Sequence, residues 1–351
     1  MSAFEFLAAS PAAFNGACLV LGLVVGSFLN VVIYRLPLML ERQWREQCAE
    51  DALAADALMA GADRPNSTAA SRSSAGPTSN TAEPPILTPR MASAEAATDL
   101  AGPTPTVVSP VRPEPFNLVV PRSACPGCGA PIRAIHNIPL LSWLLLRGKC
   151  ASCGAPISVR YPLIEALTGV LSALVAWKFG FGWPAFAALL LTWFLVALTF
   201  IDIDHQLLPD DLTLPLLWLG LFLSLWSTQA AGSAVPVDTR SSLIGAMAGY
   251  VSLWTVYHLF RLLTGKDGMG YGDFKLFAAL GAWLGWQMLL PIILIASATG
   301  AIVGLSLIAL RRQGRSTPIP FGPFLAISGW LMLMFGRPVI TGYLGLAAAL
   351  P

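Results

Sequence analysis

Long runs without charge dominate this sequence and constrain what it can fold into. Asp, Glu, Lys and Arg are absent from the stretches 6–34, 179–201, 212–237, 241–260 and 276–310, each of which has at least 20 residues. A helix needs about 20 mainly apolar residues to cross the hydrocarbon core of a bilayer. Only 11% of all residues are charged and 55% are hydrophobic, whereas soluble domains average about 25% and 45–50%. These features exclude a water-soluble globular protein and predict an all-α polytopic membrane protein surrounded by a lipid bilayer.

The apolar runs divide into about eight transmembrane helices. The run 276–310 is too long for one crossing, and Pro291 suits the first turn of a second helix. The last span could end near Phe335 or near residue 350. The expected spans are 13–34, 161–178, 183–201, 212–228, 241–261, 273–289, 291–310 and 322–350.

The basic residues predict the orientation in the membrane. If the amino terminus is outside, the segments 35–160, 261–275 and 311–315 all lie in the cytoplasm, and only three of the 21 Lys and Arg residues remain outside. Cytoplasmic loops of membrane proteins carry such an excess of positive charge. The net charge of +2 and the lack of a long basic block argue against a nucleic-acid partner.

Four regions differ in composition. We expect a first transmembrane helix in 1–37 and a largely disordered cytoplasmic insertion in 38–116, which from about residue 48 is rich in Ala, Ser, Thr and Pro without apolar periodicity. Region 117–160 clusters Cys, Gly and Pro between short apolar runs, as a small folded module does. Region 161–351 then forms a membrane domain of seven helices.

The module contains two similar cysteine pairs. Cys125-Pro-Gly-Cys128 and Cys150-Ala-Ser-Cys153 are each followed by Gly-Ala-Pro-Ile. Two such turns can offer four thiolates in a tetrahedron, which is typical of a structural zinc site in a zinc-ribbon-like module. Disulfides are the competing interpretation, but a cytoplasmic location disfavours them. A catalytic zinc would need an open position or a His ligand, for which His136 is the nearby candidate.

Two acidic residues beside the spans are the candidates for chemistry. An ionisable residue at membrane depth is costly and suggests a functional site. Asp202 ends the third expected span and Asp273 begins the sixth, both on the cytoplasmic side. Two carboxylates that share a proton can hydrolyse a peptide bond, because one activates water while the other protonates the carbonyl oxygen. Gly270 and Gly272 before Asp273 allow a substrate strand to approach closely.

The other acids receive structural interpretations. The two aspartates at 210–211 follow a proline at a helix start, where carboxylates cap free N–H groups. We expect Asp204 to point toward water with a supporting role at most, and Asp267 to be solvated in its glycine-rich loop. Glu165 should cap its helix or pair with Arg160.

Several motifs together resemble one protein family. They are, in chain order, Gly26-Ser-Phe-Leu-Asn-Val-Val-Ile-Tyr-Arg-Leu-Pro37, the paired C-x-x-C turns, Asn137-Ile-Pro-Leu-Leu-Ser-Trp143, Arg160-Tyr-Pro162, Asp202 with Pro209 seven residues on, and Gly270-x-Gly272-Asp273. This combination resembles the bacterial type IV prepilin peptidases, which are GxGD aspartyl proteases of the inner membrane. The resemblance covers almost the whole chain except 48–116, a segment longer than the family usually carries.

The resemblance implies both an activity and its residues. The expected reaction is removal of the short basic leader of prepilins and pseudopilins at the cytoplasmic face, after Gly and usually before Phe. Asp202 and Asp273 match the catalytic pair, supported by Pro209 and by Gly270 and Gly272. Family members with the cysteine module also methylate the new amino terminus with S-adenosylmethionine. Composition and spacing show no pocket for this methyl donor, so its ligands are unknown.

Two other classes of protein remain as alternatives. A proton- or ion-coupled transporter would also use membrane carboxylates near Gly and Pro breaks, but it predicts acids at the bilayer midplane and an inverted repeat. Neither feature is evident in the sequence. A non-enzymatic assembly subunit with a zinc platform predicts that Asp202 and Asp273 tolerate replacement by Asn.

The helix ends also suggest which acid carries the shared proton. Asp202 lies at the carboxyl end of its span, where the helix dipole disfavours negative charge, and Asp273 lies at an amino end, where the dipole favours it. We therefore expect Asp202 to hold the proton at rest and Asp273 to act as the base.

Overall fold

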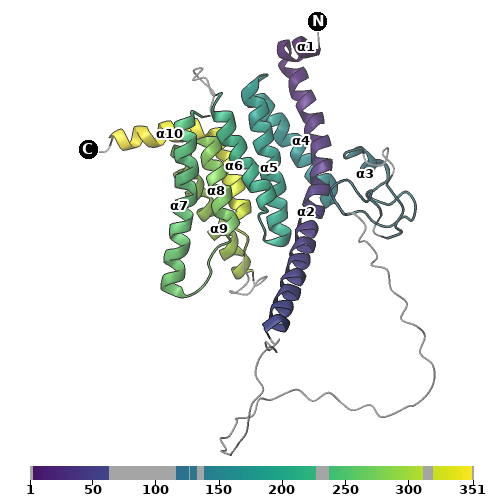
Figure 1. Cartoon of the computed structure of the whole chain (residues 1–351). Coiled ribbons are helices and arrows are strands. Elements are labelled where there is room, and N and C mark those ends of the chain that lie inside the picture. The colour runs from purple at the N-terminus through teal and green to yellow at the C-terminus, as the bar shows by residue number, and fades with distance from the viewer. Residues whose placement is uncertain are drawn as a thin grey trace, which may run out of the picture. The chain divides into compact units, whose positions relative to one another are not determined.

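The computed structural model describes residues 3–62, 116–125, 127–132, 138–226, 237–310 and 319–349, and helices are the regular secondary structure in these ranges. These ranges contain no β-strand, only two isolated bridges. Residues 63–115 and His136 lie outside them, so the expectations for both stay untested. The α-helices, labelled in Figure 1, are α1 (Ala3–Ala9), α2 (Pro11–Ala62), α3 (Leu141–Leu145), α4 (Arg160–Phe179), α5 (Trp183–His205), α6 (Asp210–Ser224), α7 (Thr239–Thr264), α8 (Tyr271–Leu284), α9 (Leu289–Ala309) and α10 (Gly322–Ala349). A short 3-10 turn, η2 (Trp286–Met288), lies between α8 and α9.

Six helical segments in the described residues are long and apolar enough to cross a membrane. They belong to α2, α4, α5, α7, α9 and α10. The expected count of eight is not confirmed. Helices occur at the two remaining places, but α6 has 15 residues and α8 has 14. At 1.5 Å per residue they are about 21–22 Å long, which is shorter than the ~30 Å hydrocarbon core.

α8 is the centre of the bundle rather than a lipid-facing span. It packs against α6, α7 and α10, and almost all of its residues from Asp273 to Leu284 are buried. A helix that is apolar all round is typically buried on all sides. α8 ends at Gly285, whose positive φ of 86° breaks the helical path. This central helix carries one of the two candidate catalytic acids at its amino end.

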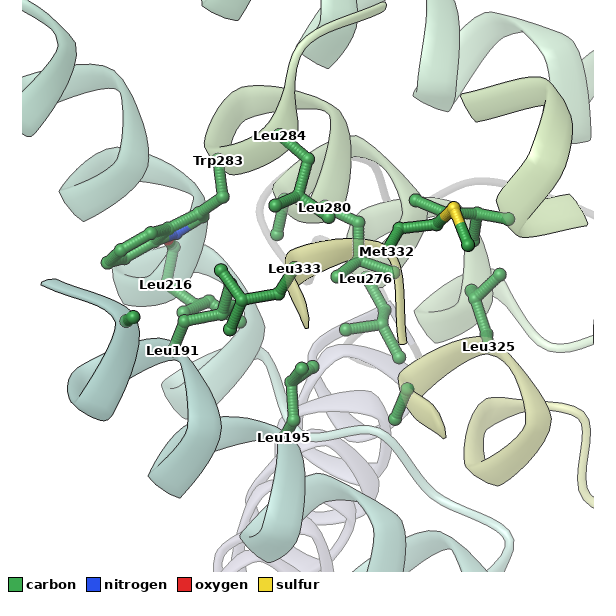
Figure 2. Packing of buried hydrophobic residues seen from close by; sticks show 14 of the residues in the cluster. Leu191, Leu195, Leu216, Leu276, Leu280, Trp283, Leu284, Leu325, Met332 and Leu333 are labelled. Atoms are coloured by element: carbon green, nitrogen blue, oxygen red, sulfur yellow. The ribbon is translucent and has the colours of Figure 1, made fainter. Parts of the chain in front are cut away.

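The core around α8 is mostly aliphatic and rich in leucine, with Trp283 among the leucines, as Figure 2 shows. The indole Nε1 of Trp283 donates a 2.8 Å hydrogen bond to the carbonyl oxygen of Leu216, so its polar atom is satisfied inside the core. The labelled side chains are Leu191 and Leu195 of α5, Leu216 of α6, Leu276, Leu280, Trp283 and Leu284 of α8, and Leu325, Met332 and Leu333 of α10.

α7 approaches α8 closely because small residues line the contact. A Cβ atom at Gly249 would lie only 2.7 Å from the carbonyl oxygen of Phe277. Ser242 on the same helix donates a 2.6 Å hydrogen bond to the carbonyl oxygen of Ala282. Small residues let membrane helices pack backbone to backbone. The position of α8 is therefore fixed by glycine and serine contacts as well as by the leucine core.

α2 is longer than expected. The sequence predicts a span over 13–34 and disorder from about residue 48, but the helix continues through Pro37 to Ala62. The expectation of disorder is therefore wrong for 48–62. The chain forms two compact units, 1–42 with 116–351 and 43–115. In the second unit only the last turns of α2 are described, and all that follows concerns the first.

Candidate active site and metal centre

Asp202 lies in the last turn of α5, where the sequence predicted it. The helix ends because Gln206 adopts a left-handed conformation with φ of 51°, and its N–H donates to the carbonyl oxygen of Asp202 at 2.9 Å. Pro209 follows in an extended conformation and starts α6. The Asp202 side chain is 5% exposed, so the carboxylate is almost completely withdrawn from solvent.

Asp273 lies in the first turn of α8. Gly270 is the N-cap residue of this helix, and its carbonyl oxygen accepts a 3.3 Å hydrogen bond from the N–H of Asp273. The Asp273 side chain is 6% exposed. Among the described residues, Asp202 Oδ2 and Asp273 Oδ1 are the buried side-chain oxygen and nitrogen atoms that have no hydrogen-bond partner. Buried polar atoms are normally satisfied, so an orphan of this kind is typical of a functional site.

The segment after α5 brings the two acids together. Leu208 is buried against the glycine loop, since a Cβ atom at Gly272 would lie 2.6 Å from Leu208 Cβ. The negative charge of Asp202 also acts directly on Asp273. Two like charges in a site of low dielectric cannot both be ionised cheaply, and such pairs share a proton. The arrangement therefore suits acid–base chemistry by a carboxylate pair.

The glycine loop before α8 is tied to α7. The hydroxyl group of Tyr257, a buried residue of α7, donates a 2.7 Å hydrogen bond to Asp267 Oδ1. Arg261 Nε lies 3.4 Å from the same oxygen. The Tyr257 ring also packs against Tyr271 and Phe274 at centroid distances of 5.4 and 5.6 Å. Asp267 is exposed, as expected, but it also anchors the loop that positions Asp273.

Asp210, the first residue of α6, forms an ion pair instead of a cap. Asp210 and Asp211 lie in the first turn as predicted, but the N-cap residue is Pro209, which has no side-chain capping bond. The carboxylate of Asp210 instead accepts hydrogen bonds of 2.6 and 2.7 Å from Lys275 Nζ on α8. This pair links the start of α6 to the start of α8, beside Asp273.

Two further acids have partners other than those expected. Arg160 forms its ion pair with Asp204 and not with Glu165. Glu165 on α4 is buried, and its Oε2 accepts a 2.8 Å hydrogen bond from the N–H of Leu140. Leu140 has a positive φ of 57°, so this bond holds a strained turn of the cysteine module against α4. Both acids therefore connect structural elements. Among the described residues, Asp202 and Asp273 are the acids that each keep a buried oxygen without a partner.

The four cysteines converge as predicted. Their sulfur atoms all lie within 4.8 Å of one another. The two turns have the same backbone geometry. The amides of Cys125 and Cys150 donate to the carbonyl oxygens of Ala130 and Ala155 at 2.9 and 2.8 Å. The glycine after each pair, at 129 and at 154, has a φ of 69° and 71°.

The sulfur geometry fits a tetrahedral metal. Four sulfurs at the usual zinc–sulfur distance of about 2.3 Å are roughly 3.8 Å apart, and Cys125 Sγ lies 3.8 Å from Cys153 Sγ. A disulfide would require about 2.05 Å, and the six cysteines are all free. Backbone N–H groups of Cys153 and Ser152 lower the pKa of Cys150 to about 6, which favours the thiolate form that binds metals. The cluster is therefore a candidate metal site.

One residue at the site is not singled out by sequence reasoning. Gly322, the first residue of α10, lies directly against Asp202. The signal that could have identified it is Ile319-Pro-Phe-Gly-Pro323, a short motif that opens a span with a glycine between two prolines. Its spacing matches no metal-binding or catalytic pattern, so only the folded structure brings it to the acid.

Comparison with known proteins places the chain in a family. The family model described as "Bacterial Peptidase A24 N-terminal domain" matches residues 20–179, and the one described as "Type IV leader peptidase family" matches residues 189–305. The chain is 46% identical over 347 residues to the prepilin leader peptidase/N-methyltransferase of Stutzerimonas stutzeri, covering 99% of both proteins. It is 48% identical over 322 residues to that of Aeromonas salmonicida, covering 92% of this chain and 91% of the relative.

The alignment with the Stutzerimonas stutzeri protein also bears on region 38–116. Because it runs over 99% of both chains, this region has a counterpart there and is not an unusual insertion. The relative from Neisseria gonorrhoeae carries the same name and is 44% identical over 89% of this chain and 87% of its own length. No solved structure matches the chain. On the family models and these relatives, the chain belongs to the type IV leader peptidase family.

Proposed function

We propose that this protein is a membrane aspartyl endopeptidase that removes the basic leader of type IV prepilins or pseudopilins. Asp202 and Asp273 are its catalytic pair. The observation that carries this assignment is the pair of buried carboxylates, each with one oxygen that has no partner among the described residues. The family membership and the names of the relatives support the reaction class.

The chemistry follows from the positions of the two acids. One carboxylate removes a proton from a water molecule, and the other, protonated, donates to the carbonyl oxygen of the scissile bond. The orphan oxygens Asp202 Oδ2 and Asp273 Oδ1 are the atoms available for this work. Gly270 leaves space beside Asp273, because a Cβ atom there would meet only Asp273 Oδ2, at 3.7 Å. Gly272 instead accommodates Leu208, and Pro209 sets the turn that carries Leu208 against the loop. Cleavage occurs after Gly and usually before Phe.

The protein acts at the bacterial inner membrane, with the acids and the cysteine module on the cytoplasmic side. The distribution of Lys and Arg supports this orientation. The organisation that fits best is a first membrane helix in 1–37, a cytoplasmic segment in 38–116, a metal module in 117–160 and the protease membrane domain in 161–351. In this orientation water reaches the catalytic pair from the cytoplasm.

The cysteine module holds a structural zinc ion, and the protein also methylates the new amino terminus with S-adenosylmethionine. Cys125, Cys128, Cys150 and Cys153 would be the zinc ligands, because their four sulfurs have the spacing of a closed tetrahedral site. Such a site has no open position for substrate, so its role is to hold the module's fold. The relatives' names include N-methyltransferase, which supports the second activity.

A single incubation tests the proposal. The purified protein is mixed in detergent with a prepilin, and mass spectrometry measures leader loss and the addition of a methyl group. Asp202→Asn and Asp273→Asn should both abolish leader loss while the proteins stay folded. A transporter or an assembly subunit predicts no cleavage by the parent protein. Uncleaved prepilin beside a well-folded parent would therefore overturn the assignment.

A further inference from the structure

A third helix end meets the catalytic pair. Asp202 belongs to the end of α5 and Asp273 to the start of α8, but the start of α10 also reaches this place. A Cβ atom at Gly322 would lie 2.5 Å from Asp202 Oδ2 and 3.1 Å from Leu208 Cδ1. No side chain fits at this position without moving the carboxylate of Asp202 or the Leu208 side chain.

The same leucine contacts both glycines. Leu208 Cβ lies where a side chain at Gly272 would be, and Leu208 Cδ1 lies where one at Gly322 would be. Leu208 is buried, at 7% exposed. Two helix starts therefore close on one side chain, and each contact depends on the absence of a Cβ atom.

The backbone at the start of α10 offers a donor to the acid. The N–H groups of Phe324 and Leu325 already bond to the carbonyl oxygen of Phe321, at 3.1 and 3.2 Å. Pro323 has no N–H, so the amide of Gly322 is the donor left at this helix end, and it interacts with the carboxylate of Asp202. The amino end of a helix also carries a partial positive charge.

We propose that Gly322 is a positioning residue, whose missing side chain lets the amino end of α10 face Asp202 and hold its carboxylate toward Asp273. This role rests on the proposed function. The active site is then built from three helix ends, the end of α5 and the starts of α8 and α10. Asp202 Oδ2 has no hydrogen-bond partner among the described residues, so it can still bond to water or substrate. The contact with the start of α10 therefore orients Asp202 and leaves this oxygen reactive.

The first experiment measures cleavage of a prepilin by Gly322→Ala. A misplacement of about 1 Å at a reacting group can cost about 100-fold in rate. We expect kcat to fall by about that factor with KM within roughly twofold, because the change acts on Asp202 and not on substrate binding. The matched control is Gly329→Ala in the same helix, whose Cβ would also lie 2.5 Å from a neighbour, here Leu280 Cδ2 in the core. Equal losses of kcat in both variants would overturn the proposal.

A second measurement does not depend on activity. Asp202→Ala removes the group that Gly322→Ala would strike, so a double-mutant cycle on thermal unfolding isolates their contact. We expect Gly322→Ala to lower the unfolding temperature of the parent and to have little effect in the Asp202→Ala protein. Equal effects in both proteins would show that Gly322 does not act through Asp202. If the parent does not cleave prepilin at all, the proposed function fails, while this cycle still decides whether the contact exists.

Discussion

Replacing either proposed catalytic acid, Asp202 or Asp273, by Asn should abolish prepilin cleavage without destabilising the fold. Asp202 and Asp273 are 5% and 6% exposed, and in the described parts of the chain each keeps one buried oxygen without a partner. An unsatisfied buried polar group costs about 1–3 kcal/mol, and more when it is charged. Each of the two orphan oxygens therefore lowers the stability of the fold. Asn has the same shape as Asp but no charge, so part of the cost should disappear.

We expect each variant to lose cleavage activity and to keep or gain stability. Proton transfer by a positioned side chain contributes about 100- to 10,000-fold to the rate, so cleavage of a prepilin should fall by at least that factor in each variant. The free energy of unfolding should stay level or rise by about 1 kcal/mol, because a neutral amide is cheaper to bury than a carboxylate. Cleavage is followed by gel or mass spectrometry and unfolding by a thermal shift in detergent.

Asp238→Ala is the control, because it should lower stability and leave cleavage unchanged. It is the N-cap residue of α7, and its carboxylate accepts a 3.0 Å hydrogen bond from the N–H of Ser241. Loss of such a cap costs about 0.5–2 kcal/mol, so Asp238→Ala should lower stability and keep cleavage. The reasoning is refuted if Asp202→Asn or Asp273→Asn retains cleavage within tenfold of the parent. It is also refuted if either variant is destabilised as strongly as Asp238→Ala.

Three further outcomes follow from the structure. If the four thiols hold the proposed zinc, Cys150→Ser should lower the zinc content per chain, whereas a disulfide framework would leave an unchanged metal-free protein. Tyr257→Phe removes the bond to Asp267 and should speed hydrogen exchange in the loop before α8 while cleavage falls severalfold; unchanged exchange would contradict the anchoring role. Trp283→Phe removes the indole donor to the Leu216 carbonyl and should lower the unfolding free energy by about 0.5–1.5 kcal/mol, and a neutral effect in thermal unfolding would argue against this bond.

The start of α10 changes the argument about the shared proton. In the sequence, Asp202 lies at a carboxyl helix end, which disfavours its negative charge, and Asp273 lies at an amino helix end, which favours it. This difference predicts that Asp202 holds the proton. The structure adds the amino end of α10 beside Asp202, and an amino end favours negative charge. The charges at the helix ends therefore no longer predict which of the two acids holds the proton. Infrared difference spectra of the two Asn variants remain the measurement that assigns the proton.

Much of the candidate site was predictable because its signals are local. Four cysteines in repeated turns predict their own convergence, since C-x-x-C followed by glycine folds the same way in each copy. Two acids in an otherwise apolar membrane chain are conspicuous for the cost of placing them there. The partners of the remaining acids were not predictable. Arg160 pairs with Asp204 and not with Glu165, and Lys275 pairs with Asp210. These ion pairs depend on how helices that are far apart in the sequence pack together.

The sequence alone predicts a helical membrane protein, the places of most of its helices, and the four thiols and two carboxylates that we propose as its metal ligands and catalytic pair. These properties follow from hydrophobic run length and from the rarity of charge, which act along the chain. The tertiary structure decided that α8 is a short buried helix at the centre of the bundle, and that α2 extends to Ala62. It also brought Gly322 against Asp202, because a close approach between distant helix ends depends on packing and leaves no pattern along the chain.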